Sequence, residues 1–274
     1  MRKFKVAVCQ MLVTENKEEN LIKAEEMIRE AKSQEAKIVV LPEIFNCPYN
    51  SQSMLEMAET YPGETTSRLS NLAKELSLYI IGGSIAEKSK NKVYNTSFIF
   101  GPQGELLGRH RKMHLFDIDI KGKITFKESD VFEAGDEVTV VDTGFCKIGV
   151  AICFDMRFPE LMRLMVLKGA EVIIVPAAFN TTTGPAHWHE TIKVRAVDNQ
   201  VYFVAASPAR NLQSSYHAYG FSTIMNPFGE VVGAAEEGET IVYGEIDLNY
   251  VEKVRQELPL LKNRRKDLYT LTEV

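Results

Sequence analysis

The sequence has no long hydrophobic run and no excess of basic residues. No stretch of about 18 consecutive apolar residues occurs in the 274 residues, so the pattern offers no candidate for a helical membrane span. The 32 Lys and Arg residues are scattered and outnumbered by 37 Asp and Glu residues. Binding to a phosphate backbone requires a basic stripe, which is missing. We therefore expect a soluble protein with neither a nucleic acid nor a membrane as its partner.

Cysteine is scarce, and the common catalytic signatures are missing. The four cysteines are widely spaced without a CxxC pair, which argues against a disulfide scaffold or a cysteine-rich zinc site: Cys9, Cys47, Cys146 and Cys153. There is no GxSxG, no GxxxxGK[ST] and no HExxH. His110 and His114 share a face but lie among arginines, and His187 and His189 point about 200° apart on a predicted helix. We predict no metal and no cofactor.

Short apolar strands alternate with amphipathic helices along the chain. Residues 14–36 carry Leu21, Ala24, Ile28 and Ala31 at helical spacing, and further helices are predicted at residues 65–77 and 158–168. Strands are predicted at residues 4–10, 38–42, 79–85, 93–100 and 105–112. Runs such as IVVLP and VIIVP are apolar on both faces, so their sheets need cover on both sides.

The two halves of the chain repeat the same order of elements. NTSFIFGPQGELLG at residues 95–108 matches GFSTIMNPFGEVVG at residues 220–233 with a constant offset of 125. If each half forms one sheet with helices on its outer face, the result is an α/β fold, a four-layer αββα sandwich. We expect residues 1–274 to form a single domain, with residues 249–274 as a C-terminal tail.

The repeat also helps to separate scaffold from chemistry. Glu43 follows the strand IVVLP, whereas the equivalent position in the second half is Ala177, so only one half needs the carboxylate. Cys153 corresponds to Cys9, but Cys153 ends its strand just before the polar turn FDMRFPE and a helix. The amide groups at a helix start stabilise a thiolate, which makes Cys153 a candidate nucleophile, with a small buried hydrophobic residue as the alternative.

Three motifs in this order resemble the nitrilase superfamily of carbon–nitrogen hydrolases: LPEIF around Glu43, HRKMHLF around Lys112 and GVAICFDMRFPE around Cys153. The likeness covers nearly the whole chain and implies a Glu-Lys-Cys triad. Residues 116–129, 182–188, 195–202 and 267–270 are most similar to the ω-amidase branch. That branch hydrolyses the terminal amide of α-ketoglutaramate and α-ketosuccinamate to the keto diacid and ammonia.

The chemistry of amide hydrolysis suits these side chains. The Cys153 thiolate would attack the carbonyl to form a thioester, and Glu43 would act as general base, then acid, then base. Lys112 would favour the thiolate and, with the backbone N–H of Phe154, would stabilise the tetrahedral intermediate. The resemblance implies that Glu128, in the stretch FKES, supports the lysine or orients the substrate.

Residues that bind the substrate are harder to choose. Tyr49, Phe179 and Thr182 lie on loops or strand ends at the predicted site and are candidates, whereas Trp188 is expected to pack. A keto acid also brings a carboxylate, and four cations are candidates for its partner: Lys123, Lys127, Arg157 and Arg195. Arg157 is equally well explained as a residue that forms a scaffold ion pair behind the nucleophile.

The resemblance implies a homodimer or larger homo-oligomer in which the tail docks onto a partner subunit. The expected location is the cytoplasm, with a mitochondrial form as the alternative. Other branches, such as a deaminated-glutathione amidase or an N-carbamoyl amidohydrolase, and a catalytically silent binding module are the competing functions. The complete triad argues against the silent module.

Overall fold

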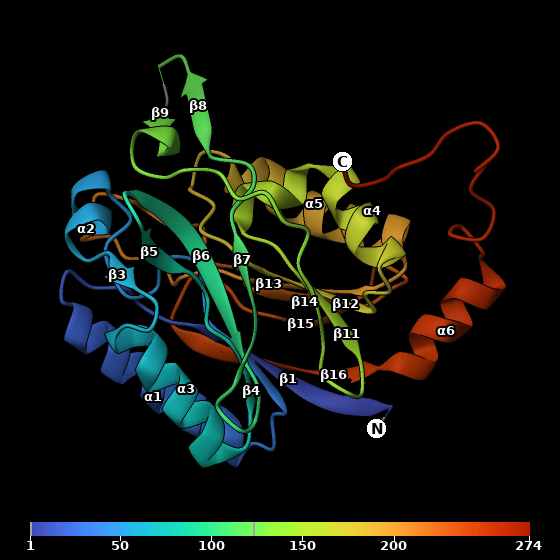
Figure 1. Ribbon diagram of the computed structural model, residues 1–274, viewed down its shortest axis with the longest axis horizontal. Helices are drawn as coiled ribbons and strands as arrows, with labels where there is room; N and C mark the ends of the chain where they lie inside the picture. Colours follow the sequence, from blue (N-terminus) through green and yellow to red (C-terminus); the bar gives the residue numbers. More distant parts are fainter. Residues whose placement is uncertain (1, 123) are drawn as a thin grey trace.

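Two β-sheets face each other, and each carries helices on its outer side (Figure 1). The structure is a computed structural model that describes residues 2–122 and 124–274. The order of layers is helix, sheet, sheet, helix, as the alternation of strands and helices predicts. The prediction of an αββα sandwich is confirmed.

The first sheet has eight strands, and α1 (Lys17–Ser33) and α3 (Glu64–Leu76) cover its outer face. Its order is β16-β1-β2-β4-β6-β5-β3, with β7 also paired to β6. Asn16 begins α1 by accepting hydrogen bonds from the N–H groups of Glu18 and Glu19. The strands are β1 (Lys3–Gln10), β2 (Ile38–Val40), β3 (Glu59–Thr60), β4 (Tyr79–Ile81), β5 (Ile85–Ser89), β6 (Lys92–Phe100), β7 (Leu106–Arg111) and β16 (Thr240–Asp247).

The second sheet has six strands in the order β10-β11-β12-β13-β14-β15, and α4 (Pro159–Leu167) and α5 (Gly184–Asn199) cover it. Each of these helices has a proline in its first turn, where the missing N–H costs nothing. The strands are β10 (Val140–Asp142), β11 (Lys147–Val150), β12 (Val172–Pro176), β13 (Tyr202–Ala206), β14 (Thr223–Met225) and β15 (Val231–Ala234).

The internal repeat is present in the pairing of the strands. The order β1-β2-β4-β6-β7 in the first sheet corresponds to β11-β12-β13-β14-β15 in the second, with two parallel pairs followed by two antiparallel pairs in both. The β6–β7 ladder shifts register between Ile99 and Phe100, and the β14–β15 ladder shifts between Ile224 and Met225. The same offset of 125 relates the two shifts, so the halves are structural copies.

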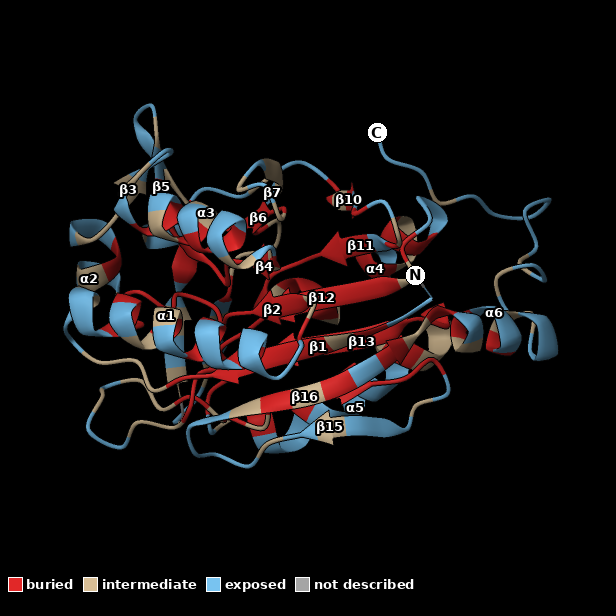
Figure 2. Ribbon diagram, turned by 90° about the horizontal axis from the view of Figure 1, so that it is seen from below, coloured by how far each residue is buried: buried red, intermediate tan, exposed pale blue. Residues whose placement is uncertain are grey.

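Three apolar layers hold the sandwich together. Val6 and Val8 of β1 point between the sheets, whereas Ala7 and Cys9 point toward α1. Figure 2 shows the central strands buried along most of their length, with exposed residues on the outer sides of the helices. Cover on both sides explains why these strands are apolar throughout instead of alternating with polar residues.

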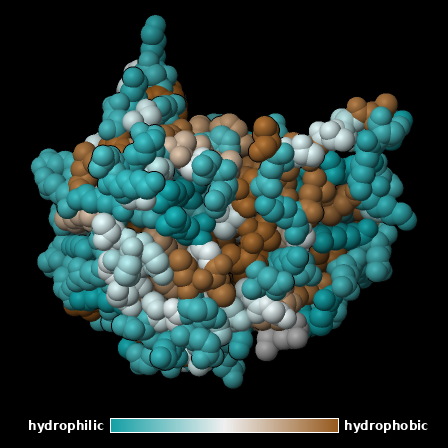
Figure 3. Space-filling model, viewed as in Figure 1, coloured by the Kyte–Doolittle hydropathy of each residue, from teal (hydrophilic) through white to brown (hydrophobic). Residues whose placement is uncertain are grey.

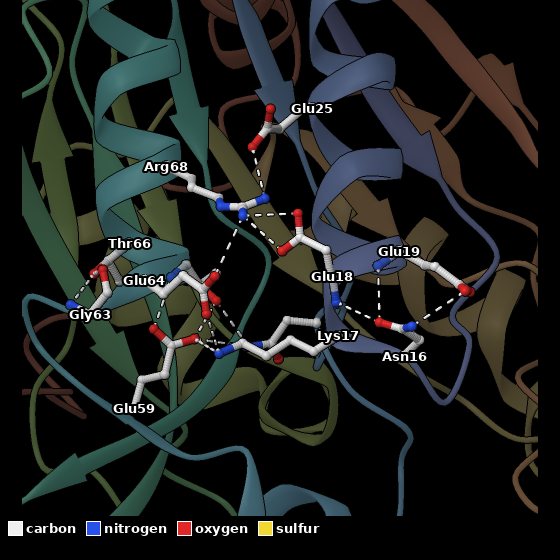
Figure 4. A network of polar contacts seen from close by, with 12 residues as sticks. Asn16, Lys17, Glu18, Glu19, Glu25, Glu59, Gly63, Glu64, Thr66 and Arg68 are labelled. Atoms are coloured by element: carbon white, nitrogen blue, oxygen red, sulfur yellow. Dashed lines mark hydrogen bonds and ion pairs between the residues drawn. The ribbon is translucent and has the colours of Figure 1, made fainter.

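A network of ion pairs joins the outer helices of the first sheet (Figure 4). Arg68 of α3 contacts Glu18 of α1 at 2.7 Å, and Lys17 of α1 contacts Glu59 and Glu64 at 3.0 Å each. Exposed pairs of this kind each contribute little to stability. Their effect is to align α1 with α3 over the apolar layer beneath.

Several smaller segments surround the end of the sheets that carries the site. They are α2 (Ser51–Glu56), the hairpin β8 (Asp117–Ile120) with β9 (Ile124–Lys127), and the 3₁₀ helices η1 (Glu128–Asp130) and η2 (Cys153–Arg157). The β8–β9 hairpin projects from the body in Figure 1. The chain ends with α6 (Leu248–Glu257) and residues 258–274, which form turns only. Among the described residues, no helix has the length and apolar character needed to cross a membrane.

Candidate active site

Glu43 lies in the turn after β2, and neighbouring backbone holds this turn in place. The N–H of Ile44 donates to Ser84 Oγ at 3.0 Å, and the N–H of Ser84 donates to the carbonyl of Pro42 at 3.2 Å. Gly83 has φ of +54°, and a Cβ there would lie 2.1 Å from the Pro42 carbonyl oxygen, so the close approach requires glycine. The fully buried Glu43 side chain is therefore set on a rigid turn.

Lys112 follows β7 and lies between two buried carboxylates. Its Nζ is 2.8 Å from Glu43 Oε1 and 2.8 Å from Glu128 Oε2, and all three side chains are fully buried. Glu128 also accepts the N–H of Phe116 at 2.6 Å. Glu128 thus contacts the lysine directly, which is one of the two arrangements that the resemblance implies.

Cys153 occupies a sharp turn between β11 and α4. Its φ is +46°, a left-handed conformation that few residues other than glycine adopt, and its side chain is 4% exposed. The thiol interacts with the carboxylate of Glu43, the ammonium of Lys112 and the N–H of Ala178. Phe154 follows in the first turn of η2, where an amide N–H is available from the turn itself. The structure therefore brings Glu43, Lys112 and Cys153 together from three distant parts of the chain.

Burial sets the protonation of these groups. Burial raises the pKa of Glu43, and the nearby Glu128 raises it further, while Lys112 opposes both. Burial would lower the pKa of Lys112, but the two carboxylates outweigh burial and raise this pKa well above its usual value. Lys112 is therefore a permanent cation, and Glu43 is a carboxyl group whose affinity for a proton is increased.

The resting sulfur differs from the sequence expectation. A nearby lysine and a helix start were expected to favour a thiolate, but burial and the Glu43 carboxylate raise the pKa of Cys153 well above its usual value. Lys112 and the Ala178 N–H lower it without compensating. The thiol therefore holds its proton until an acceptor takes it, because a buried anion loses more hydration than one lysine restores.

Asp155 forms a second buried cluster that the sequence analysis missed. Its Oδ2 lies 2.9 Å from His110 Nε2 and accepts the Ile152 N–H at 3.0 Å, and its Oδ1 accepts the N–H of His114 at 2.9 Å and lies 2.8 Å from His114 Nδ1. A carboxylate only accepts, so the facing ring nitrogens carry hydrogens. Burial would raise the pKa of Asp155, but these hydrogen bonds lower it well below its usual range.

The cluster ties together the two segments that carry Lys112 and Cys153. His110 and His114 stand on either side of Lys112, while Asp155 stands two residues after Cys153. His110 and His114 thus share one carboxylate. Within residues 2–122 and 124–274, no group of three or more His, Cys, Asp or Glu side chains is arranged to hold a metal ion.

Asp155→Asn is expected to lower both stability and activity. The asparagine side chain places an NH₂ donor where the carboxylate now accepts from His110 or Ile152. Two buried donors then face each other, which lowers the free energy of unfolding by about 2–4 kcal/mol. Urea unfolding and initial rates of amide hydrolysis measure the two effects. Asp142→Asn is the control, because Asp142 is an exposed residue whose carboxylate also accepts a main-chain N–H. Equal stability of the two variants would contradict the role of the cluster.

A cavity opens beside Glu43. Tyr49 and Tyr216 line it with their rings 4.5 Å apart, and the Tyr49 hydroxyl donates to Glu43 Oε1 at 3.4 Å. Phe179 and Thr182 do not line this cavity: Phe179 packs on Trp188, and the N–H of Thr182 donates to Asn180 Oδ1. The fully buried Trp188 packs as predicted and donates to the carbonyl of Phe221.

The four candidate partners of a substrate carboxylate differ in their surroundings. Arg195 donates to the carbonyls of Met156 and Arg157, Lys127 is exposed, and Lys123 lies outside the described residues. The half-buried Arg157 lies over the Phe179 ring at 4.5 Å and donates to His187 Nδ1 at 3.0 Å. Burial lowers the pKa of Arg157, and no carboxylate among the described residues pairs with it. The proposed scaffold ion pair is therefore absent from the described part of the chain.

Comparisons of the sequence and of the structure with known proteins identify the same family. The profile of the carbon–nitrogen hydrolase family matches residues 5–256. The chain belongs to this family. The omega-amidase NIT2 of Xenopus tropicalis is 50% identical over 273 residues, covering 100% of this chain and 99% of its own. The human omega-amidase NIT2 is 49% identical over 271 residues, covering 99% of this chain and 98% of its own.

Solved structures agree with this assignment. Saccharomyces cerevisiae Nit3, a member of branch 10 of the nitrilase superfamily, superposes with a TM-score of 0.89 at 45% identity, covering 96% of this chain and 97% of its own. The C. elegans NitFhit protein superposes with a TM-score of 0.91 at 33% identity, covering 99% of this chain and 67% of its own. The predicted superfamily and its αββα fold are confirmed.

Proposed function

We propose that this carbon–nitrogen hydrolase cleaves the terminal amide of short ω-amido keto acids, α-ketoglutaramate and α-ketosuccinamate, to the keto diacid and ammonia. The main support is the buried group of Glu43, Lys112 and Glu128 beside Cys153. This group occurs in a chain that is 50% identical to an omega-amidase. Glu43, Lys112 and Cys153 are assigned the catalytic roles, and Glu128 supports Lys112.

In the first half-reaction, Glu43 takes the thiol proton as the Cys153 sulfur attacks the amide carbonyl. Glu43 Oε2 is buried, and no group among the described residues donates a hydrogen bond to it. This oxygen is therefore available as a base. Glu43 then gives the proton to the amide nitrogen. The C–N bond breaks, ammonia leaves, and a thioester to Cys153 remains.

In the second half-reaction, Glu43 takes a proton from water, whose oxygen attacks the thioester carbonyl. The C–S bond breaks, the free acid leaves, and the proton returns to the sulfur. The raised pKa of Glu43 suits a group that gains and loses a proton in each half-reaction. In both halves the negative oxygen is stabilised by the Lys112 ammonium and the N–H of Phe154.

Arg157 is the proposed partner of the substrate carboxylate, because it is near Cys153 and lacks a carboxylate partner of its own. Arg157→Leu is expected to raise KM for α-ketoglutaramate by about 10–100-fold, the loss of one charge-assisted pair, and to change kcat much less. Turnover of an uncharged short amide should stay unchanged. Lys127→Met, which removes an exposed cation, is the control. Equal effects on charged and uncharged amides would contradict this assignment.

Ammonia release tests the substrate directly. Purified protein is assayed with α-ketoglutaramate, α-ketosuccinamate, deaminated glutathione and N-carbamoyl amino acids at equal concentration. We expect the highest kcat/KM with the two keto acids. Turnover of deaminated glutathione or an N-carbamoyl amino acid without turnover of the keto acids would contradict the proposed substrate but not the proposed mechanism.

We also propose that the chain works as a homodimer in which the C-terminal tail docks onto the partner. Residues 249–257 of the expected tail lie in α6, where Val251 and Val254 are buried within this chain, so residues 258–274 are the proposed docking segment. This segment exposes Leu258, Leu268 and Tyr269, and hydrophobic side chains gather beside it in the middle of the face in Figure 3. Apolar surface of this kind marks association sites. Removal of residues 258–274 should yield a monomer in light scattering. A truncated chain that remains dimeric would reject the proposed role of the tail.

A further inference from the structure

Asn95 is a buried polar residue at the centre of the site to which the mechanism above assigns no role. It lies on β6 with no exposed surface, next to the equally buried Thr96. Because successive side chains of a strand point to opposite faces, Asn95 faces Glu43 while Thr96 donates to Glu87 at 2.8 Å. The strand thus offers a site residue and a matched neighbour outside the site.

One residue contacts all three charged members of the site. Asn95 Nδ2 donates to Glu43 Oε1 at 2.9 Å and to Glu128 Oε1 at 3.1 Å. The carbonyl of Asn95 accepts the backbone N–H of Lys112 at 2.8 Å. The side-chain amide therefore bridges the two carboxylates, and the backbone fixes the start of the lysine.

The hydrogen bonds from Asn95 partly compensate an excess of negative charge in the site. Lys112 supplies one positive charge for two buried carboxylates, and a neutral amide adds two N–H donors without adding charge. With Asn95, Lys112 and Tyr49, Glu43 Oε1 has three donors, whereas Oε2 has no such partner among the described residues. The two oxygens of the same carboxylate thus have different surroundings.

We propose that Asn95 is a positioning residue of the reaction: it holds Glu43 with Oε1 engaged and leaves Oε2 free to take the thiol proton. The inference rests on the proposed function of Glu43 as the base. Asn95 itself touches neither the thiol nor the substrate in this account, and it acts through the carboxylate.

The role has a consequence for pH dependence. The titratable groups around Glu43 are Lys112, Glu128, Cys153, Tyr49 and Tyr216. A hydrogen bond to the charged form lowers the pKa of a carboxyl group, so the loss of the Asn95 donor raises the pKa of Glu43 further. Because Glu43 must be ionised to accept the thiol proton, the acid limb of acylation moves to higher pH.

Asn95→Leu and Asn95→Ala test the proposal, with Thr96→Val as the matched control. Two profiles are measured for each: kcat/KM for ammonia release against pH, and the rate of Cys153 alkylation by iodoacetamide against pH, read by intact mass and peptide mapping. We expect kcat to fall by at least about 10-fold with KM within about threefold of wild type. Both acid limbs should move up by at least about half a pH unit in the Asn95 variants. Thr96→Val should lose some stability and shift neither limb.

The proposal is overturned if folded Asn95 variants keep the wild-type kcat and acid limb, or if Thr96→Val shifts the limbs equally. Asn95→Ala removes atoms without adding bulk, so it carries the test where leucine prevents folding. Alkylation does not depend on the natural substrate. A wild-type protein that releases no ammonia would therefore reject the proposed function, while the alkylation profile would still decide the role of Asn95.

Discussion

Cys153→Ala is expected to lower amide hydrolysis by at least about 1,000-fold, the loss of roughly 4 kcal/mol of transition-state stabilisation. Without the sulfur no thioester can form. Ammonia release gives the rate. Intact mass after rapid acid quenching gives the acyl adduct, which should appear on the wild-type chain and disappear in the variant.

Cys9→Ala is the control, because Cys9 is another buried cysteine. The sequence match of Cys9 to Cys153 is wrong by two residues: Val6 pairs with Ile38, and Ile148 pairs with Val172, the counterpart of Ile38, so Met11 takes the place of Cys153 in the first half. Both cysteines are buried, but Cys9 lies in the apolar layer beneath α1. Its replacement removes one buried sulfur and should cost about 1 kcal/mol of stability without loss of turnover. If Cys153→Ala kept its activity, or if the adduct mapped to another cysteine, the mechanism would be wrong.

Lys112→Met is expected to damage both the reaction and the fold. Removing the cation leaves Glu43 and Glu128 buried without a counterion, which costs about 3–5 kcal/mol at neutral pH. The developing oxyanion also loses its positive charge, so kcat should fall by at least about 100-fold. Urea unfolding and initial rates measure the two losses.

The stability loss of Lys112→Met should depend on pH. Without the lysine, the pKa of Glu43, which burial already raises, rises further, so its protonated form favours folding at low pH and this contribution is lost as pH rises. The deficit relative to wild type should therefore be smaller at about pH 5 than at about pH 7.5. Adding Glu128→Gln should restore part of the stability. Lys92→Met, which removes an exposed ion pair with Glu133, is the control and should change little.

Most strands and helices could be predicted from the chain because the spacing of their apolar residues is a local property. The predicted strand at residues 38–42 is β2, which ends two residues earlier (Ile38–Val40), and the predicted helix at residues 14–36 is α1 (Lys17–Ser33). Apolar residues at fixed spacing record which faces are covered, and that spacing survives without any knowledge of partners. The sequence range 79–85 was wrong in part: it divides into β4 and β5, because Gly83 turns the chain toward Pro42.

The contribution of Asn95 could have been found by a criterion already applied to Glu43. In the repeat, Asn95 corresponds to Gly220, whereas Ser97 is retained as Ser222. A polar residue present in only one half therefore marked the site. Asp155 gave no comparable signal, because its value depends on two histidines 41 and 45 residues earlier.

Sequence alone was sufficient for the order of elements, for the four-layer αββα sandwich and for the choice of Glu43, Lys112 and Cys153, which meet in the buried site, since each of these rests on local spacing or on a motif. The protonation of the site was decided only by the folded molecule. The Cys153 thiol and the Glu43 carboxyl group change their proton affinity when water is removed and neighbours approach within hydrogen-bonding distance. Those distances join residues separated by up to about 110 positions, and no pattern along the chain contains them.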